Sequence, residues 1–283
     1  MSLLRHIAIC NAWEPGKFLP FLHEKARLGL IRRDNAERLR RFPKLFEVRG
    51  DAVNVIASGG PKAISAAIDD AVEELVSLGV IAKWRNEFFA VAERWGAKLH
   101  FTLDRGAVPF FGVKAYGVHL NGYRRAGKNL KLWIGTRAAG KLVAPSKLDN
   151  IVAGGIGVKY GLEETLLKEA AEEAAMPKRL ASRAVAVGAV SYRMETKTGL
   201  RNDVLFLYDV ETPADFKPCN TDGELVAFDL MDARDVVTRM RKTDDFKFNV
   251  NLVNIDFALR HGVIGPEDPE YLDLVTGLHK PID

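Results

Sequence analysis

The chain contains very little cysteine. Cys10 and Cys219 lie far apart among its 283 residues and outside any CxxC or Cys/His pattern. Disulfide frameworks and zinc modules need several cysteines at short spacings, so neither is expected, and both thiols are expected to be free. The histidines do not replace them, because no two are spaced along the sequence like a pair of metal ligands. They are His6, His23, His100, His119, His261 and His279.

Long apolar runs are lacking as well. No stretch approaches the ~18 apolar residues that indicate a membrane-spanning helix, and Trp13, Glu14 and Pro15 interrupt the short apolar segment near the start. We therefore expect a cytoplasmic protein with no signal peptide and no membrane partner. The net charge of +4 suits a small anionic substrate at least as well as nucleic acid, which usually requires a denser basic patch. No nucleic-acid partner is expected, and the sequence leaves the oligomeric state open.

Several common nucleotide and hydrolase motifs are also missing. A dinucleotide fingerprint built on Gly155 and Gly157 would need a third glycine at position 160, which is Tyr160. No phosphate-loop GKS or GKT follows, and no GxSxG elbow is present. These absences exclude dinucleotide binding of that type, P-loop chemistry and a serine hydrolase.

The apolar patterns change near residue 112 and predict two domains, 1–112 and 113–283. Helical spacing predicts helices over residues 61–79 and 85–96 in a mostly helical first part. After the boundary, alternating residues predict strands over 129–137 and neighbouring segments. A helix is predicted over 162–174, further strands follow, and a closing helix is predicted over 249–261.

The helix predicted over residues 162–174 gathers carboxylates. Glu169, Glu172 and Glu173 share the i, i+3, i+4 spacing of one helix face, apart from an apolar stripe formed by Leu167, Ala170, Ala171 and Ala174. Carboxylates so close together repel one another unless a cation neutralises them, and hard divalent ions accept such oxygen ligands. The spacing alone also fits an ordinary solvated helix, so it indicates a metal site without establishing one.

This segment resembles the Nudix box, whose usual pattern is G-x5-E-x7-R-E-U-x-E-E-x-G-U with U aliphatic. Glu169 matches the glutamate of its R-E pair, and Glu172 and Glu173 match its E-E pair. Lys168 stands where arginine is usual and Ala175 where glycine is usual. The segment between the glycines and Lys168 is one residue short. The early glutamate of the pattern therefore has no clean counterpart, although Glu163 or Glu164 could substitute.

The resemblance extends to a subfamily associated with thiamine pyrophosphokinase, and covers about residues 17 to 275. The stretches that carry it include FLPFLHEKARLGLIRRDNAERLRRFPKLFEV, KLDNIVAGG, VSYRMETKTGLRNDVLFLYDVE and NTDGELVAFDLM. The resemblance implies an α/β fold, a Nudix αβα sandwich with a mixed sheet, preceded by a smaller α+β N-terminal domain. It also implies hydrolysis of thiamine diphosphate or, preferentially, its oxidised analogues to the monophosphate.

The resemblance further implies roles for individual residues. Glu169, Glu172 and Glu173 would bind Mg²⁺ or Mn²⁺, while Gly154 and Gly155 would form the turn into the helix and contact substrate or metal. The general base would be Glu172, Glu173 or Glu224, although Glu224 equally fits the flank of a turn. Lys168 would orient a carboxylate or would simply be solvated. Arg137, at the end of its predicted strand, fits either a contact to a terminal phosphate or an ordinary surface charge.

Two other functions compete with this reading. The first is Nudix hydrolysis of a nucleoside diphosphate derivative such as ADP-ribose. The second is a ligand-binding sensor that keeps the fold without catalysis, which the retention of all three glutamates disfavours. Phosphate release with and without Mg²⁺ distinguishes these readings.

Overall fold

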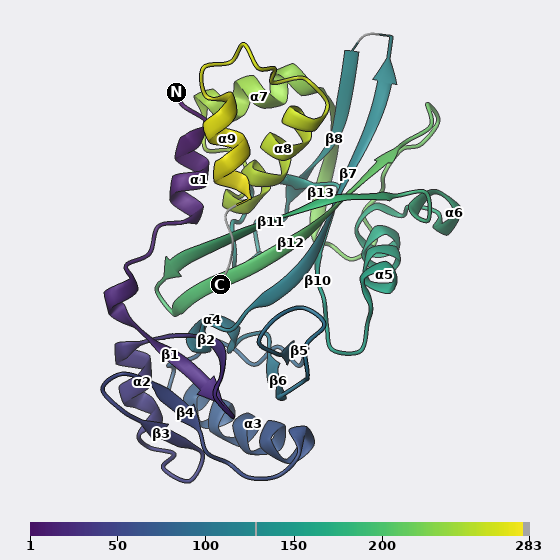
Figure 1. The fold of residues 1–283 in the computed structure, drawn as a ribbon. Coiled ribbons are helices and arrows are strands. Elements are labelled where there is room, and N and C mark those ends of the chain that lie inside the picture. Colours follow the sequence, from purple (N-terminus) through teal and green to yellow (C-terminus); the bar gives the residue numbers. More distant parts are fainter. Residues whose placement is uncertain (128, 280–283) are drawn as a thin grey trace.

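The computed structural model describes residues 1–127 and 129–279. Figure 1 shows two units, a smaller one at the bottom of the view and a larger one built on long, twisted strands. Within the described residues, no helix combines the length and the apolar character that crossing a membrane would require.

The smaller unit combines a four-stranded sheet with a hairpin and short helices. The sheet has the order β2-β1-β4-β3, in which β1 and β4 are parallel and the other pairs antiparallel. The elements are η1 (Pro15–Lys17), β1 (Phe18–His23), β2 (Ala26–Arg32), α2 (Arg33–Leu39), β3 (Phe46–Val48), β4 (Val53–Val55), α3 (Pro61–Ser77), β5 (Phe88–Val91), β6 (Phe101–Asp104) and α4 (Val108–Phe111). Helix α3 confirms the helix predicted over 61–79. Its buried residues Ile64, Ile68 and Leu75 form one face against the sheet.

One predicted helix is wrong. Residues 85–96 contain strand β5, which pairs with β6 in an antiparallel hairpin. Asn86 has a left-handed φ of 57° that interrupts any helix at this point. Phe89 and Val91 are buried while Ala90 between them is exposed, which is the alternation of a strand. A short apolar run fits both periods, and pairing with β6 decides between them.

The larger unit is built on a seven-stranded mixed sheet. Its strands follow the order β11-β12-β7-β8-β13, with β10 paired to β7 and β9 paired to β8. Strands β7 and β12 are parallel, and the other neighbours are antiparallel. The strands are β7 (Ala115–Ala126), β8 (Asn129–Arg137), β9 (Leu148–Asn150), β10 (Val152–Gly155), β11 (Val185–Thr196), β12 (Gly199–Glu211) and β13 (Leu225–Asp232).

Helices cover both faces of this sheet, which confirms the predicted αβα sandwich (Figure 1). Alternation along β8 shows the two faces: Leu132 and Ile134 pack into one core, and Trp133 between them packs into the other. Helices α5 (Leu162–Ala174) and α6 (Lys178–Ala181) cover one face. The opposite face carries α1 (Leu4–Cys10), α7 (Ala233–Lys242), α8 (Phe248–Arg260) and α9 (Tyr271–Leu278).

Helix α1 begins the chain but packs with the larger unit. Leu3, Ile7 and Cys10 are buried in the same core as Leu274 and Leu278 of α9. The division into residues 1–112 and 113–283 stays a prediction. The packing shows in addition that α1 covers the larger sheet. The chain passes between the units at Gly112, directly after α4.

Asp69 on α3 is a half-buried carboxyl whose charge is expected to make stability depend on pH. Burial, with the charges of Asp104, Glu73 and Asp70, raises the pKa of Asp69 to about 6. We expect Asp69→Asn to stabilise the protein most above pH 6, where the native carboxylate is charged. The gain should shrink as the pH falls toward about 4, because the folded protein then takes up the proton. Denaturant unfolding across this range tests it, and the matched control is Asp51→Asn, which removes an exposed charge that is not among those raising the pKa of Asp69. An equal gain at every pH would contradict the assignment.

Candidate active site

Helix α5 begins and ends with backbone features that fix its position. Gly161 precedes the helix, and its N–H donates to the Glu164 carboxylate at 3.0 Å. The Thr165 hydroxyl donates to the Gly161 carbonyl at 2.8 Å. At the other end Ala175 adopts a left-handed φ of 47°, a conformation in which glycine is usual. Glu164 therefore caps the helix start, which leaves Glu169, Glu172 and Glu173 as the carboxylates of its second half.

Glu173 is buried rather than presented on a solvated face. Its side chain lies among the buried residues of α5, 4% exposed, and its carboxylate accepts a hydrogen bond from the Ala153 N–H of β10 at 2.7 Å. Burial raises the pKa of Glu173 well above its usual range, and the charges of Asp149, Glu169 and Glu224 add to this. The predicted apolar stripe is accordingly wrong in part. Ala170 and Ala174 are buried, but Ala171 is exposed and Glu173 takes its place toward the sheet.

Glu169 lies against the glycine strand β10. A Cβ atom added to Gly154 would lie 2.3 Å from Glu169 Cγ, so only glycine leaves room for this side chain. Burial raises the pKa of Glu169, and the neighbouring Lys168 acts against that rise. At the adjacent position, a Cβ on Gly155 would lie 2.6 Å from the Phe89 ring of the smaller unit. Both glycines lie in strand β10 and not in a turn that enters the helix, so that part of the prediction is wrong. Gly154 allows close packing of Glu169 and Gly155 allows close packing of Phe89, and a contact to substrate stays a prediction for each.

Lys168 joins two of the predicted ligands. Its Nζ lies 3.2 Å from Glu169 Oε1 and 2.7 Å from Glu172 Oε2. Burial lowers the pKa of Lys168, but the two carboxylates raise it by more. The pKa therefore lies above its usual value. Glu172 is the most solvent-accessible of the three glutamates, with a side chain 46% exposed. The geometry fits the orienting role predicted for Lys168.

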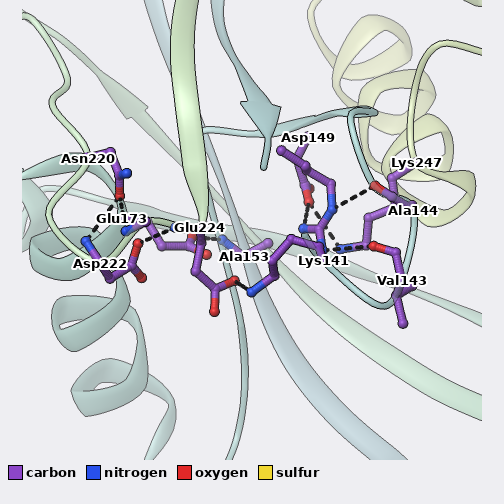
Figure 2. A network of polar contacts seen from close by, with 12 residues as sticks. Lys141, Val143, Ala144, Asp149, Ala153, Glu173, Asn220, Asp222, Glu224 and Lys247 are labelled. Atoms are coloured by element: carbon purple, nitrogen blue, oxygen red, sulfur yellow. Dashed lines mark hydrogen bonds and ion pairs between the residues drawn. The ribbon is translucent and has the colours of Figure 1, made fainter. Parts of the chain in front are cut away.

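Glu224 lies near Glu173 although the two are distant in sequence (Figure 2). Its negative charge contributes to the raised pKa of both Glu169 and Glu173. The Glu224 carboxylate forms an ion pair with Lys141 Nζ at 2.6 Å. Lys141 was not predicted from the sequence. The Glu224 backbone N–H donates to the Asp222 carboxylate at 2.8 Å, so Glu224 also flanks a turn, as the alternative prediction had it.

The loop before Glu224 is held by the end of α5. Thr221 donates from its N–H and its hydroxyl to the Glu172 carbonyl, at 3.2 and 2.6 Å. Cys219 N–H donates to the Ala174 carbonyl at 3.1 Å. These bonds satisfy carbonyls that the helix end leaves without partners. They also fix the position of Glu224 relative to the helical carboxylates.

Arg137 is occupied by protein groups. It is 8% exposed, and its guanidinium donates to Asp149 at 2.6 Å and to the carbonyls of Val143 and Ala144. Lys247 Nζ also lies 3.2 Å from Asp149 (Figure 2). The surface-charge reading of Arg137 is therefore wrong. A phosphate contact would have to compete with these buried acceptors, so the contacts favour a structural role.

The charges of the cluster fit a divalent cation. Its carboxylates outnumber its ammonium groups, with Glu169, Glu172, Glu173 and Glu224 against Lys141 and Lys168. Neighbouring charges of one sign repel one another unless a counter-ion or protonation offsets them. Glu169, Glu172 and Glu173 all project from one helix and offer the oxygen ligands that Mg²⁺ and Mn²⁺ prefer.

The smaller unit supplies one aromatic side chain, Trp95, to the face of the larger sheet that carries α5. Trp95, in the loop between β5 and β6, lies 4.8 Å from Tyr116 and 5.0 Å from Phe206, measured between ring centroids. Tyr116 and Phe206 pack beside the core under α5, and Trp95 stays 44% exposed. We call these three rings the aromatic cluster. Sequence reasoning missed it, because Trp95 was assigned to a helix.

Comparison with known proteins identifies the family. Residues 2–115 match a family described as a domain of unknown function, DUF4743. Nudix hydrolase 20 of Arabidopsis thaliana, named as chloroplastic, is 41% identical over 274 residues, which span 93% of this chain and 73% of that protein. The chain belongs to the Nudix hydrolase family. The Arabidopsis Nudix hydrolase 24, also named as chloroplastic, is 40% identical over 266 residues, again 93% and 73% of the two chains.

Among solved structures, the Nudix domain of Shewanella oneidensis NrtR in complex with ADP-ribose has 16% identity and a TM-score of 0.42. The match covers 56% of this chain and 93% of that one. The names of the Arabidopsis relatives leave the expected cytoplasmic location of this Nudix hydrolase a prediction.

The structure corrects one reading of the Nudix box. Gly154, whose missing side chain makes room for Glu169, is the glycine from which the pattern should be counted. From Gly154 to Lys168 the spacing is complete, and no residue is missing. Tyr160 then occupies the place of the early glutamate. Neither Glu163 nor Glu164 needs to substitute, and Glu164 already caps the helix.

Proposed function

We propose that this Nudix hydrolase cleaves the diphosphate of thiamine diphosphate, or of its oxidised analogues, to the monophosphate and inorganic phosphate. Water attacks one phosphorus, the bridging P–O–P bond breaks, and the attacking water loses its proton to a carboxylate. The observation that carries the proposal is the crowded carboxylate cluster around the buried Glu173. The aromatic cluster adds a surface suited to a heteroaromatic ring.

Each residue of the cluster has a part in this proposal. Glu169, Glu172 and Glu173 would hold Mg²⁺ or Mn²⁺, which when bound neutralises charge on the phosphate oxygens. The Ala153 amide holds Glu173 in place, and Lys168 holds Glu169 against Glu172. Glu224 is the carboxylate best placed to accept a proton, since it comes from a separate loop, with Glu172 and Glu173 as alternatives.

ADP-ribose is the second candidate substrate, because a cluster of three aromatic rings accepts adenine as readily as thiamine. The products distinguish the two. Thiamine diphosphate releases inorganic phosphate, whereas cleavage of the ADP-ribose diphosphate yields two phosphate monoesters and no inorganic phosphate. We therefore expect inorganic phosphate from thiamine diphosphate or an oxidised analogue, only with Mg²⁺ or Mn²⁺ present. AMP and ribose phosphate from ADP-ribose alone would favour the second candidate. Binding without turnover of either would favour a sensor.

The role of the aromatic cluster in substrate binding can be tested separately. We expect Trp95→Ala to raise KM for an aromatic diphosphate about tenfold, because stacking on an aromatic side chain contributes roughly 1–3 kcal/mol. The value of kcat should change little, since Trp95 lies outside the carboxylate cluster. Trp13→Ala is the matched control, because Trp13 packs on Phe18 instead. An alkyl diphosphate without a ring should show no KM change. A tenfold loss with that substrate too would indicate a general structural defect.

A further inference from the structure

Two histidines that are distant in sequence meet in the smaller unit. His23 ends β1, and His100 directly precedes β6. Their Nδ1 atoms lie 2.9 Å apart across 77 residues of sequence. Both side chains are buried, each 8% exposed, with ring centroids 5.1 Å apart and the rings nearly perpendicular. The fold thus creates a pair of imidazole nitrogens that the sequence spacing did not reveal.

The turn after His23 adds a carboxylate. Glu24 and Lys25 connect β1 to β2 with left-handed φ values of 50° and 70°. Two-residue turns of this kind normally use asparagine and glycine, because other residues pay a steric cost there. Despite that cost, the turn places Glu24 next to the histidines. Ligand atoms of His23, Glu24 and His100 all lie within 4.8 Å of one another.

The two facing nitrogens can share a single cation. A neutral imidazole carries one N–H, so two facing Nδ1 atoms either share a proton or coordinate the same ion. In a tetrahedral zinc site each nitrogen lies about 2.0–2.1 Å from the metal, which places the two nitrogens roughly 3.3 Å apart. The observed separation of 2.9 Å therefore needs only a small outward movement of the rings.

We propose that His23, His100 and Glu24 bind a divalent transition-metal ion, with Zn²⁺ as the best match. Two imidazoles and one carboxylate form a donor set that Zn²⁺ favours and Mg²⁺ does not. Glu24 is exposed, so the fourth coordination position faces solvent. Glu24 now pairs with Lys98 at 3.1 Å, an exposed contact of little energetic weight that the metal displaces.

Metal binding here joins two segments of the smaller unit. His23 and Glu24 lie at the β1–β2 hairpin, while His100 lies in the loop that follows β5 and carries Trp95. The His100 N–H already donates to the Val91 carbonyl at 2.9 Å, which closes this loop at its base. An ion at this site therefore anchors the segment that brings Trp95 to the larger sheet. The metal site does not depend on which diphosphate is hydrolysed.

Titration of the metal-free protein with Zn²⁺ and with Co²⁺ tests the proposal. Excess Mg²⁺ occupies the oxygen-ligand site of the larger unit during the titration. We expect about one equivalent of Zn²⁺ in calorimetry, and visible Co²⁺ absorption typical of nitrogen ligands. His100→Gln should lose this equivalent, and Glu24→Gln should weaken it at least about tenfold. Zn²⁺ should raise the Tm of the wild type but not of His100→Gln.

Two controls make the outcome decisive. His279→Gln removes an exposed histidine outside the cluster and should leave the equivalent intact. Glu24→Gln changes an exposed side chain, so it remains informative even where His100→Gln fails to fold. The proposal is overturned if the wild type binds no Zn²⁺ in excess Mg²⁺. It is also overturned if Glu24→Gln and His279→Gln bind with equal affinity and stoichiometry.

Discussion

Glu173→Gln is expected to lower kcat for diphosphate hydrolysis about a thousandfold without loss of stability. Metal ions supply several kcal/mol of charge stabilisation in such reactions, and about 1.4 kcal/mol corresponds to a factor of ten in rate. Glutamine keeps the size of the side chain and an oxygen that accepts the Ala153 N–H. It removes one of the negative charges crowded around Glu169 and Glu224. The Tm should therefore stay the same or rise.

Glu164→Gln is the matched control for this variant. Glu164 belongs to the same helix, but its carboxylate accepts the Gly161 N–H and caps the helix start. Turnover of Glu164→Gln should stay within about twofold of the wild type, with at most a small loss of stability. Metal-dependent product formation and thermal unfolding are measured on both variants. Wild-type turnover by Glu173→Gln would refute its assignment as a metal ligand.

Gly112→Ala is expected to destabilise the protein by about 3 kcal/mol or more. Gly112 has a left-handed φ of 59°, and an added Cβ would lie 1.9 Å from the Leu30 carbonyl oxygen. The Leu30 oxygen is a backbone atom and the position of a Cβ is fixed by the backbone, so no rotamer change relieves the clash. The Gly112 carbonyl also accepts hydrogen bonds from Leu30 N–H at 3.1 Å and from the Asn202 side chain at 3.3 Å. A shift at this residue therefore disturbs contacts to both units.

Gly79→Ala measures the cost of the left-handed backbone conformation without the steric clash. Gly79 has a similar φ of 69°, but an added Cβ there meets no atom within 4 Å. We expect it to cost roughly 1–2 kcal/mol, the penalty for an ordinary residue in the left-handed region. Urea unfolding of both variants measures the difference. Equal losses at the two positions would show that the contact with Leu30 is not what requires glycine at 112.

The features that could be predicted from sequence are those set by local pattern. Helix α5 spans the predicted residues because its periodicity, its glycine entry and its length agree. Sequence reasoning therefore placed Glu169, Glu172 and Glu173 on one helix. It did not foresee the burial of Glu173, because burial depends on where β10 lies. The predicted helix over 85–96 failed for a related reason, since pairing with β6 overrides an ambiguous local period.

Contacts between distant segments could not be predicted. Glu224 was named from the motif around it, but its ion pair with Lys141 depends on the pairing of β13 with β8. The proximity of His23 and His100 likewise depends on packing of the β1–β2 hairpin against the β5–β6 loop. Arg137 is a case in which a contact between distant segments overturned a local prediction. Its place at a strand end fitted a surface role, yet Asp149 lies beside it only because β9 pairs with β8.

The position of α1 has a consequence for how the chain folds. Leu3, Ile7 and Cys10 belong to the same core as Leu274 and Leu278, so residues very distant in sequence must meet to complete this core. The buried core of the smaller unit comes from residues 19–113, whereas the larger sheet keeps one apolar face open until α1, α8 and α9 pack on it. Contacts of such long sequence separation form slowly. We therefore expect closure of this face to be a late step of folding, in which α1 joins α8 and α9 in one helical layer.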